Sequence, residues 1–186
     1  MGAGFVLVMG VCGVGKTTVA RAMADMAGAH YLEGDDFHPE ENVRAMAQGR
    51  PLSDADRWPW LESICAGALA AHESDNAPVV IACSALKKRY RDLLRQRLGD
   101  LAIIHLTGDR ELIRARMEQR EGHFMPARLL DSQLRDLEAP RADEGDVLVL
   151  DISGTEAAIL NTARAYFSGR LQTDRRARSA SADSGA

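Results

Sequence analysis

"GVCGVGKTT", residues Gly10 to Thr18, directly follows the apolar run "FVLVM" of residues 5–9. The spacing of Gly10, Gly15, Lys16 and Thr17 matches in full the glycine-rich loop that binds phosphate groups between a strand and a helix. Glycines let the chain curl until successive N–H groups point inward at phosphate oxygens. A helix that begins near Gly15 adds the positive end of its dipole at the same point. This stretch therefore predicts a nucleoside-triphosphate site.

Different residues of this loop have different predicted roles. We expect Lys16 to reach the β- and γ-phosphates and the Thr17 hydroxyl to ligate Mg²⁺. The alternative is a glycine-rich turn with a solvated lysine, but the strand before the loop and the amphipathic stretch after it favour phosphate binding. The predicted nucleotide-binding residues are Gly10, Val11, Cys12, Gly13, Val14, Gly15, Lys16, Thr17 and Thr18.

The composition of the chain limits the class of protein. It has 186 residues, 46% of them apolar and 27% charged, as is usual for one soluble globular domain. A formal net charge of -4 argues against a broad nucleic-acid-binding surface. Cys12, Cys65 and Cys83 are too scattered for a disulfide framework or a zinc site, which favours the cytoplasm. The N-terminal apolar run is only as long as a strand, so we expect neither a signal peptide nor a membrane span.

Apolar runs of strand length alternate with helix-like stretches along the chain. The expected strands are residues 5–9, 30–32, 79–83, 101–106 and 147–152, and the expected helices are residues 17–26, 57–72, 85–98, 110–120, 129–137 and 156–167. Such alternation predicts an α/β fold in which a parallel five-stranded sheet is covered by helices on both faces. Ser153 and Glu156 are spaced to form a capping box at the last helix.

We expect residues 1–172 to form one kinase-sized domain and residues 173–186 to form a disordered tail. The tail, "TDRRARSASADSGA", has no apolar residue other than alanine, so it offers little surface to bury. Its basic cluster suits an anionic partner, but a solvated tail is the simpler interpretation.

A phosphate-loop domain of this size is either a small-molecule kinase or a switch GTPase. "VLVLDISG" ends in Asp151 and Gly154, which resembles the switch motif that senses the γ-phosphate. It comes too late in the chain, however, and the sequence has no Asn-Lys-x-Asp motif for reading guanine. The kinase interpretation is therefore favoured.

A kinase needs a carboxylate that orients the acceptor hydroxyl and takes its proton. "YLEGDDFHP" supplies carboxylates at the end of the second strand, where α/β sheets bind their ligands. Asp35 is the predicted base, Glu33 is expected to support the Mg²⁺ shell through water, and Asp36 is a less certain neighbour. His38 is a candidate donor to substrate, with a structural histidine as the alternative. A solvated acidic turn is the alternative for the whole segment.

A kinase also needs a cationic cover that excludes water from the phosphates. Arg116 and Arg120 are four residues apart, hence on one helical face, and an irregular segment with His123 follows before Arg128. We expect residues of about 121–135 to form a mobile lid, with Arg116 and Arg120 as catalytic arginines. The alternative is a solvated arginine-rich helix face.

Five segments together resemble one family: "GVCGVGKTT", "EGDDFHPEENVRAM", "GRPLSDADRWPWL", "ACSALKKRYRDLLR" and "REGHFMPARLLDSQLRDLE". They span residues 5–170 and resemble the gluconate kinases of the thermoresistant gluconokinase type. The resemblance implies a nucleoside-monophosphate-kinase-like P-loop fold with a mobile lid and, commonly, a homodimer. It also implies ATP- and Mg²⁺-dependent phosphorylation of D-gluconate at its 6-hydroxyl, which yields 6-phosphogluconate.

The implied substrate is an anion with a row of hydroxyls, so its pocket needs a cation and several polar groups. Arg57 is the candidate partner for the carboxylate, unless it forms an ion pair with Asp54 or Asp56. Ser84 is expected to hold substrate or the Mg²⁺ water shell, with capping of the next helix as the alternative. The remaining candidate substrate-binding residues are Lys87 and Arg91, four apart on one helix, and His123 and Gln133 on the lid side.

Departures from the family pattern and competing functions stay open at this point. Many members carry Ser at the positions of Cys12, Val14 and Thr17, and Asp at that of Glu33. A thiol near a helix N-terminus can have a lowered pKa, so Cys12 is either readily alkylated and protected by ATP or a small inert loop residue. Shikimate, another sugar acid and a nucleoside monophosphate are alternative acceptors. A catalytically silent nucleotide-binding module is the alternative from another class.

Overall fold

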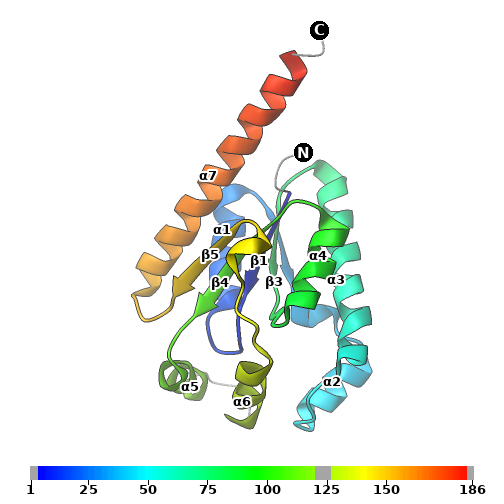
Figure 1. Ribbon diagram of the computed structural model, residues 1–186, viewed down its shortest axis with the longest axis vertical. Coiled ribbons are helices and arrows are strands. Elements are labelled where there is room, and N and C mark those ends of the chain that lie inside the picture. Colours follow the sequence, from blue (N-terminus) through cyan, green and yellow to red (C-terminus); the bar gives the residue numbers. More distant parts are fainter. Residues whose placement is uncertain (1–3, 120–126, 184–186) are drawn as a thin grey trace.

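The computed structural model describes residues 4–119 and 127–183, apart from the side chains of residues 127, 128, 142 and 171–183. Strands and helices alternate along the chain (Figure 1). The strands are β1 (Phe5–Met9), β2 (His30–Glu33), β3 (Val79–Ala82), β4 (Leu101–Thr107) and β5 (Val147–Asp151). The helices are α1 (Lys16–Ala27), α2 (Glu40–Ala47), α3 (Asp54–Asp75), α4 (Lys88–Leu98), α5 (Arg110–Glu118), α6 (Ala127–Asp136) and α7 (Glu156–Asp183), with short 3₁₀ turns η1 (Gly34–Phe37) and η2 (Ala142–Glu144).

The strands form one parallel sheet in the order β2-β3-β1-β4-β5. The prediction of a parallel five-stranded sheet is confirmed. β1 lies at the centre, where Phe5 pairs with Val79 on one side and with Leu101 on the other. The chain leaves β1 for β2 at one edge, returns to β3, and then crosses to β4. The strand order therefore reverses beside β1, and such a switch point is where α/β sheets bind ligands.

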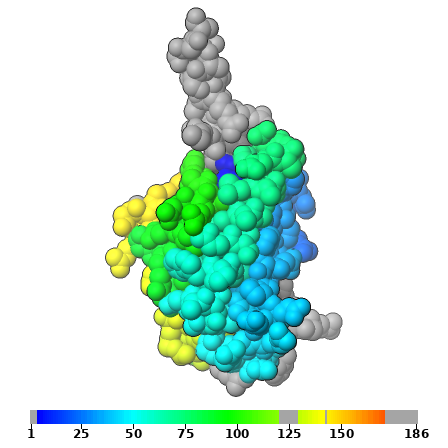
Figure 2. Space-filling view, turned by 90° about the vertical axis from the view of Figure 1, so that its right-hand side faces the viewer, coloured from blue at the N-terminus to red at the C-terminus, as the bar shows by residue number. Residues whose placement is uncertain are grey.

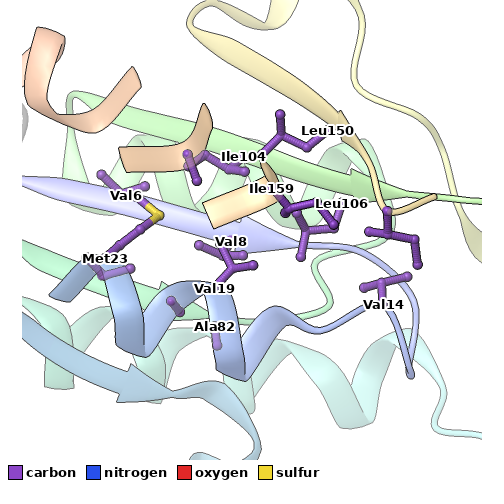
Figure 3. Packing of buried hydrophobic residues seen from close by; sticks show 14 of the residues in the cluster. Val6, Val8, Val14, Val19, Met23, Ala82, Ile104, Leu106, Leu150 and Ile159 are labelled. Carbon is purple, nitrogen blue, oxygen red and sulfur yellow. The ribbon is translucent and has the colours of Figure 1, made fainter. Parts of the chain in front are cut away.

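Side chains that alternate along the strands build a core on each face of the sheet. On one face, Val6 and Val8 of β1 pack with Met23 of α1 and Phe167 of α7. Figure 3 shows Val19 and Met23 reaching from α1 to this face of the strands. On the other face, Leu7 and Met9 pack with the apolar side of α3 and α4. Figure 2 views the molecule from this second side, where α3 runs along most of the surface.

Helix α3 begins earlier than the sequence predicted because its N-terminus is capped. The Ser53 hydroxyl accepts from the Asp56 N–H at 3.3 Å, and the Asp56 carboxylate accepts from the Ser53 N–H at 2.8 Å. This reciprocal pair satisfies N–H groups that the first turn leaves without partners. The helix then continues through Pro59. Arg57 is consequently held in a rigid helical turn.

Other elements differ from the predicted ones for local reasons. Helix α2 was not predicted, and α4 begins at Lys88 because Ala85 adopts a φ of 40° that a helix cannot contain. Thr155, not Ser153, caps α7, since its hydroxyl accepts from the Ala158 N–H at 3.3 Å while the Ser153 N–H bonds Asp151.

Helix α7 continues past the predicted domain boundary. The backbone of residues 173–183 is helical, where the sequence predicted disorder, and α7 projects beyond the sheet in Figure 1. Alanine and arginine both have high helix propensity. Within residues 4–119 and 127–183, no helix has both the length and the apolar character needed to cross a bilayer.

Candidate active site

The glycine-rich loop joins the carboxyl end of β1 to the N-terminus of α1. Gly10, Gly13 and Gly15 have φ of 142°, 83° and 95°, a region that side chains with a Cβ rarely adopt. A Cβ on Gly10 would also lie 2.5 Å from the Leu106 carbonyl oxygen. The loop therefore needs these glycines both for its curl and for its close approach to β4.

Two donors of this loop have acceptors within the protein. The Lys16 ammonium donates to the Val11 carbonyl at 3.0 Å, and the Cys12 N–H donates to Gln133 Oε1 at 2.7 Å. Gln133 lies on α6, so the predicted lid-side residue contacts the loop directly. A phosphate in the loop would compete with both of these acceptors.

The predicted metal residues Thr17 and Glu33 lie in contact. The Thr17 hydroxyl donates to Glu33 Oε2 at 2.8 Å, and the Tyr31 hydroxyl donates to the same oxygen at 2.6 Å. Hydroxyl and carboxylate oxygens are suitable ligands for Mg²⁺, so this pair fits the expected ion. In the described part of the chain, no three His, Cys, Asp or Glu residues cluster as a metal cage.

A pocket of about 80 Å³ opens beside the loop. It is bounded by the glycine loop, the turn after β2, the N-terminal half of α3, the end of β3 and α6. Its polar and charged lining residues include most of the predicted catalytic and substrate-binding set: Lys16, Asp35, His38, Arg57, Ser84 and Gln133. The predicted base and the phosphate-loop lysine therefore face one cavity.

His38 is held flat against Trp60 in this pocket. The two rings stack with centroids 4.2 Å apart and planes 12° apart, and Trp60 Nε1 donates to the Gly34 carbonyl at 2.6 Å. Burial, with the nearby charge of Arg57, lowers the pKa of His38 to about 4. The imidazole is therefore neutral near pH 7, and can donate one hydrogen bond and accept another.

Arg57 is paired with α6. Its Nη1 donates to Asp136 Oδ2 at 3.1 Å and to the Tyr90 hydroxyl at 3.2 Å. The alternative pairing with Asp54 or Asp56 is wrong, because Asp54 instead binds Lys87 at 3.0 Å and the Asp56 carboxylate accepts from the Ser53 N–H and hydroxyl. Arg57 still lines the pocket, so an anion there would meet a cation that has one carboxylate partner.

Two further predicted residues follow β3. Ser84 lines the pocket, and it does not cap α4, whose N-cap residue is Lys87. The capping alternative for Ser84 is therefore wrong. Lys87 is held by Asp54 of α3 and is not one of the pocket-lining residues.

Arg91 lies in the interior and not in the pocket. Its side chain is 0% exposed and forms a two-pronged ion pair with Glu144, with both N–O distances 2.7 Å. Its remaining terminal nitrogen donates to the Ala85 and Leu86 carbonyls. The prediction of substrate contact does not fit this position, because every guanidinium nitrogen is already used within the core. Its physical role is to join α4 to the segment before β5.

We predict that Arg91→Met lowers the free energy of unfolding by about 3 kcal/mol, the lower end of the usual loss, because the buried Glu144 carboxylate keeps only Arg95, at 3.2 Å, as a cationic partner. Burial alone would raise the pKa of Glu144, but hydrogen bonds from Arg91, from the Arg141 N–H and from Arg95, together with the charge of Arg91, hold it at about 2, below its usual 4.5. The stabilisation is therefore complete above pH 4.5 and is lost as the pH falls toward 2. Chemical denaturation at several pH values measures this difference between variant and parent.

Arg97→Met is the matched control on the same helix. Arg97 pairs with Glu62 at the surface, where the two side chains are 49% and 37% exposed. Its loss should cost less than about 1 kcal/mol. Equal costs for the two variants would contradict the assigned role of Arg91.

Arg116 lies beside a second pocket, of about 360 Å³, on the other side of the loop. Its Nη2 donates to the Ile152 carbonyl at 2.7 Å, and Gly13, Val14 and Gly15 line the same pocket. The Arg116 guanidinium thus faces the end of β5. The sequence had instead predicted that it covers the γ-phosphate. Arg120 and His123 lie outside the described residues.

Cys12 is not an activated thiol in this structure. Burial raises its pKa above the usual value, although Lys16 acts in the opposite direction. Its sulfur lies 3.6 Å from that of Met117. The hypothesis of a lowered pKa is therefore wrong, because half-burial outweighs the neighbouring positive charge.

We accordingly expect Cys12 to react with iodoacetamide more slowly than free cysteine at pH 8, since the thiolate is the nucleophile. Mass spectrometry of the alkylated native protein over time measures this rate. Unfolded protein at the same pH supplies the reference. Faster labelling of Cys12 in the native protein would contradict the raised pKa.

Tyr31, Trp60 and Asp136 contribute to the site, but sequence reasoning gave them no role in binding or catalysis. Tyr31 is two residues before Glu33 on a strand, so both side chains lie on one face, and this spacing was the signal available. Asp136 is three residues after Gln133 on a helix, hence on a neighbouring position of its surface. The contact of Asp136 with Arg57, 79 residues away, has no local signal.

The glycine-rich loop follows the central strand, and the Thr17–Glu33 pair adjoins it. Lys16 and Asp35 line one pocket beside the loop. These features are typical of a P-loop kinase that acts on small molecules. Residues 5–140 match the family model described as AAA domain. The chain is 43% identical over 163 residues to the thermosensitive gluconokinase of Escherichia coli, covering 88% of this chain and 86% of that one. It is 45% identical over 150 residues to the gluconokinase of Gluconobacter oxydans, covering 81% and 82%. This chain belongs to the gluconokinase family.

Solved structures agree with this assignment. The crystal structure of a gluconokinase from Sinorhizobium meliloti superimposes with a TM-score of 0.81 at 41% identity, covering 95% of this chain and 96% of that one. Shikimate kinase from Bacteroides thetaiotaomicron has a TM-score of 0.58 at 15% identity, covering 90% and 97%. The second likeness concerns the fold alone.

Proposed function

We propose that this chain transfers the γ-phosphate of ATP to the 6-hydroxyl of D-gluconate, giving 6-phospho-D-gluconate and ADP. Membership of the gluconokinase family supports the reaction. The structural observation that supports the proposal is that Lys16, Asp35 and Arg57 line the same pocket. It offers a phosphate-binding cation, a carboxylate for a hydroxyl and a guanidinium for a sugar-acid anion.

The triphosphate occupies the glycine loop. N–H groups of the loop and of the first turn of α1 hold its oxygens, and Lys16 turns from the Val11 carbonyl to the β- and γ-phosphates. Thr17 and Glu33 would hold Mg²⁺, Glu33 through water. The ion, when bound, neutralises charge on the β- and γ-phosphate oxygens. Arg116 and Ile159 line the pocket on the outer side of the loop, which we assign to the nucleoside.

The acceptor lies in the smaller pocket. Asp35 orients the 6-hydroxyl and receives its proton as the phosphorus–oxygen bond forms. Arg57 holds the carboxylate at the other end of the substrate by exchanging Asp136 for it. Neutral His38 and the Ser84 hydroxyl, which both line this pocket, bond the intervening hydroxyls. This arrangement fixes the reacting oxygen relative to the phosphate, which is the main task of a phosphotransferase.

The remaining elements of the proposal concern the lid and the assembly. We expect a lid of about residues 121–135, of which residues 121–126 lie outside the described residues and the α6 portion carries the Gln133 contact with the loop. Arg120 and His123, which lie outside the described residues, keep their expected roles in catalysis and substrate binding, and Lys87 supplements the positive charge near the acceptor. The protein works as a homodimer in the cytoplasm, a prediction that gel filtration with light scattering and cell fractionation can test.

The first test is an ADP-release assay with Mg·ATP and a series of acceptors. D-gluconate should give strong turnover, while shikimate, 2-keto-gluconate, glucose and AMP should give little beyond the control without acceptor. Selective turnover of another acceptor would keep the kinase mechanism and overturn the substrate. Activity with none of them would favour a silent nucleotide-binding module.

Asp35→Asn should lower kcat by about a hundred- to ten-thousand-fold, the usual loss when a general base is removed. The affinity for ATP should stay nearly unchanged, because Asp35 acts on the acceptor. Steady-state kinetics together with calorimetric nucleotide binding measure both quantities. Asp36→Asn is the neighbouring control, and near-normal turnover of Asp35→Asn would show that another group serves the hydroxyl.

Arg57→Ala should raise KM for gluconate by about 10–100-fold, the equivalent of about 1.5–3 kcal/mol for a hydrogen bond between charged groups. Asp136→Asn is the matched control, because it frees Arg57 without removing it and should leave KM for gluconate unchanged or lower. An unchanged KM in Arg57→Ala with a lower melting temperature would instead make Arg57 a purely structural partner of Asp136.

A further inference from the structure

Glu33 receives two hydrogen bonds on one oxygen. Thr17 donates from the first turn of α1 at 2.8 Å, and Tyr31 donates from two residues earlier on β2 at 2.6 Å. The Tyr31 ring is itself steadied by Arg21, whose guanidinium carbon lies 5.0 Å from the ring centroid. Tyr31 thus joins a cation on α1 to the carboxylate at the end of β2.

The Thr17 hydroxyl has one proton and two lone pairs. In this geometry the proton goes to Glu33, which leaves the lone pairs of the hydroxyl oxygen for a cation. This orientation is maintained only while the Glu33 carboxylate stays in place. Glutamate has several rotatable bonds and loses side-chain entropy when it is held in one orientation. A second donor on the same oxygen helps to offset that cost and to keep the carboxylate in place.

We propose that Tyr31 is a positioning residue for the magnesium site, its hydroxyl holding Glu33 in the orientation that serves Thr17 and the ion. The inference deepens the proposed function, since it rests on the Thr17–Glu33 site for Mg²⁺. Residues that hydrogen-bond to metal ligands, and so orient them, commonly affect metal affinity almost as much as the ligands themselves do. Tyr31 is not among the lining residues of either described pocket, so in this role it acts through Glu33.

Tyr31→Phe tests this role because it keeps the ring above Arg21 and removes only the hydroxyl. The measurement is the calorimetric affinity for ADP, once with saturating MgCl₂ and once with EDTA. We expect the gain in affinity that Mg²⁺ provides to fall by about tenfold, while the affinity for metal-free ADP stays unchanged. The ratio is taken within each variant, so a general loss of stability does not imitate the effect.

Two further variants control the experiment. Tyr166→Phe removes another tyrosine hydroxyl that donates to a carboxylate, that of Asp146, and should leave the ratio unchanged. Adding Tyr31→Phe to Glu33→Gln should cause no further loss, because the residue through which Tyr31 acts has already been altered. An unchanged ratio in Tyr31→Phe, or an equal further loss in the double variant, would overturn the inference.

The assay contains no acceptor, so it separates this inference from the choice of substrate. If gluconate proves not to be phosphorylated but the Mg²⁺-dependent gain still falls in Tyr31→Phe, the role of Tyr31 stands. If the parent protein shows no Mg²⁺-dependent gain at all, both the metal site and the inference fail.

Discussion

The placement of β1 between β3 and β4 is the constraint on which the site depends. β1 is buried on both faces, and its apolar side chains alternate between the two cores. Because the neighbouring strands are parallel to it, the segments that follow β1 and β3 emerge at one edge of the sheet. The glycine loop, the acidic turn after β2 and Ser84 after β3 therefore converge, although they are far apart in the chain.

The cations of the site are already paired within the protein. Lys16 has a carbonyl, Arg57 has Asp136, and Arg116 has the end of β5. A lone buried charge is costly, and such internal partners lower that cost. Under the proposed function, a phosphate or carboxylate oxygen replaces the Val11 carbonyl on Lys16 and Asp136 on Arg57, while Arg57 keeps its bond to the Tyr90 hydroxyl. Lys16 and Arg57, which line one pocket, are in this sense already held in place within the protein.

Local motifs made much of this structure predictable. The glycine loop, the strand–helix alternation and the acidic turn are encoded in adjacent residues, and the resulting sheet is as expected. The failures concern contacts between distant residues. Nothing near Arg91 in the sequence indicates that Glu144 would draw it into the core, so its helical spacing from Lys87 suggested the pocket. Likewise the residues next to Cys12 in the sequence, a helix N-terminus and Lys16, predict a lowered thiol pKa. Burial of Cys12 by distant parts of the chain, among them Met117 and α6, raises the pKa instead.

The pairing of Arg57 with Asp136 has a consequence for selectivity under the proposed function. A neutral polyol entering the pocket cannot replace a carboxylate on a guanidinium, because it offers no charge in exchange. It would therefore meet an arginine that stays bound to α6, and it would bind without the contact that fixes its far end. A sugar acid can make the exchange. The ion pair would thus favour anionic over neutral substrates. The selection would depend on whether the substrate can displace Asp136 from Arg57, and not on the size of the cavity.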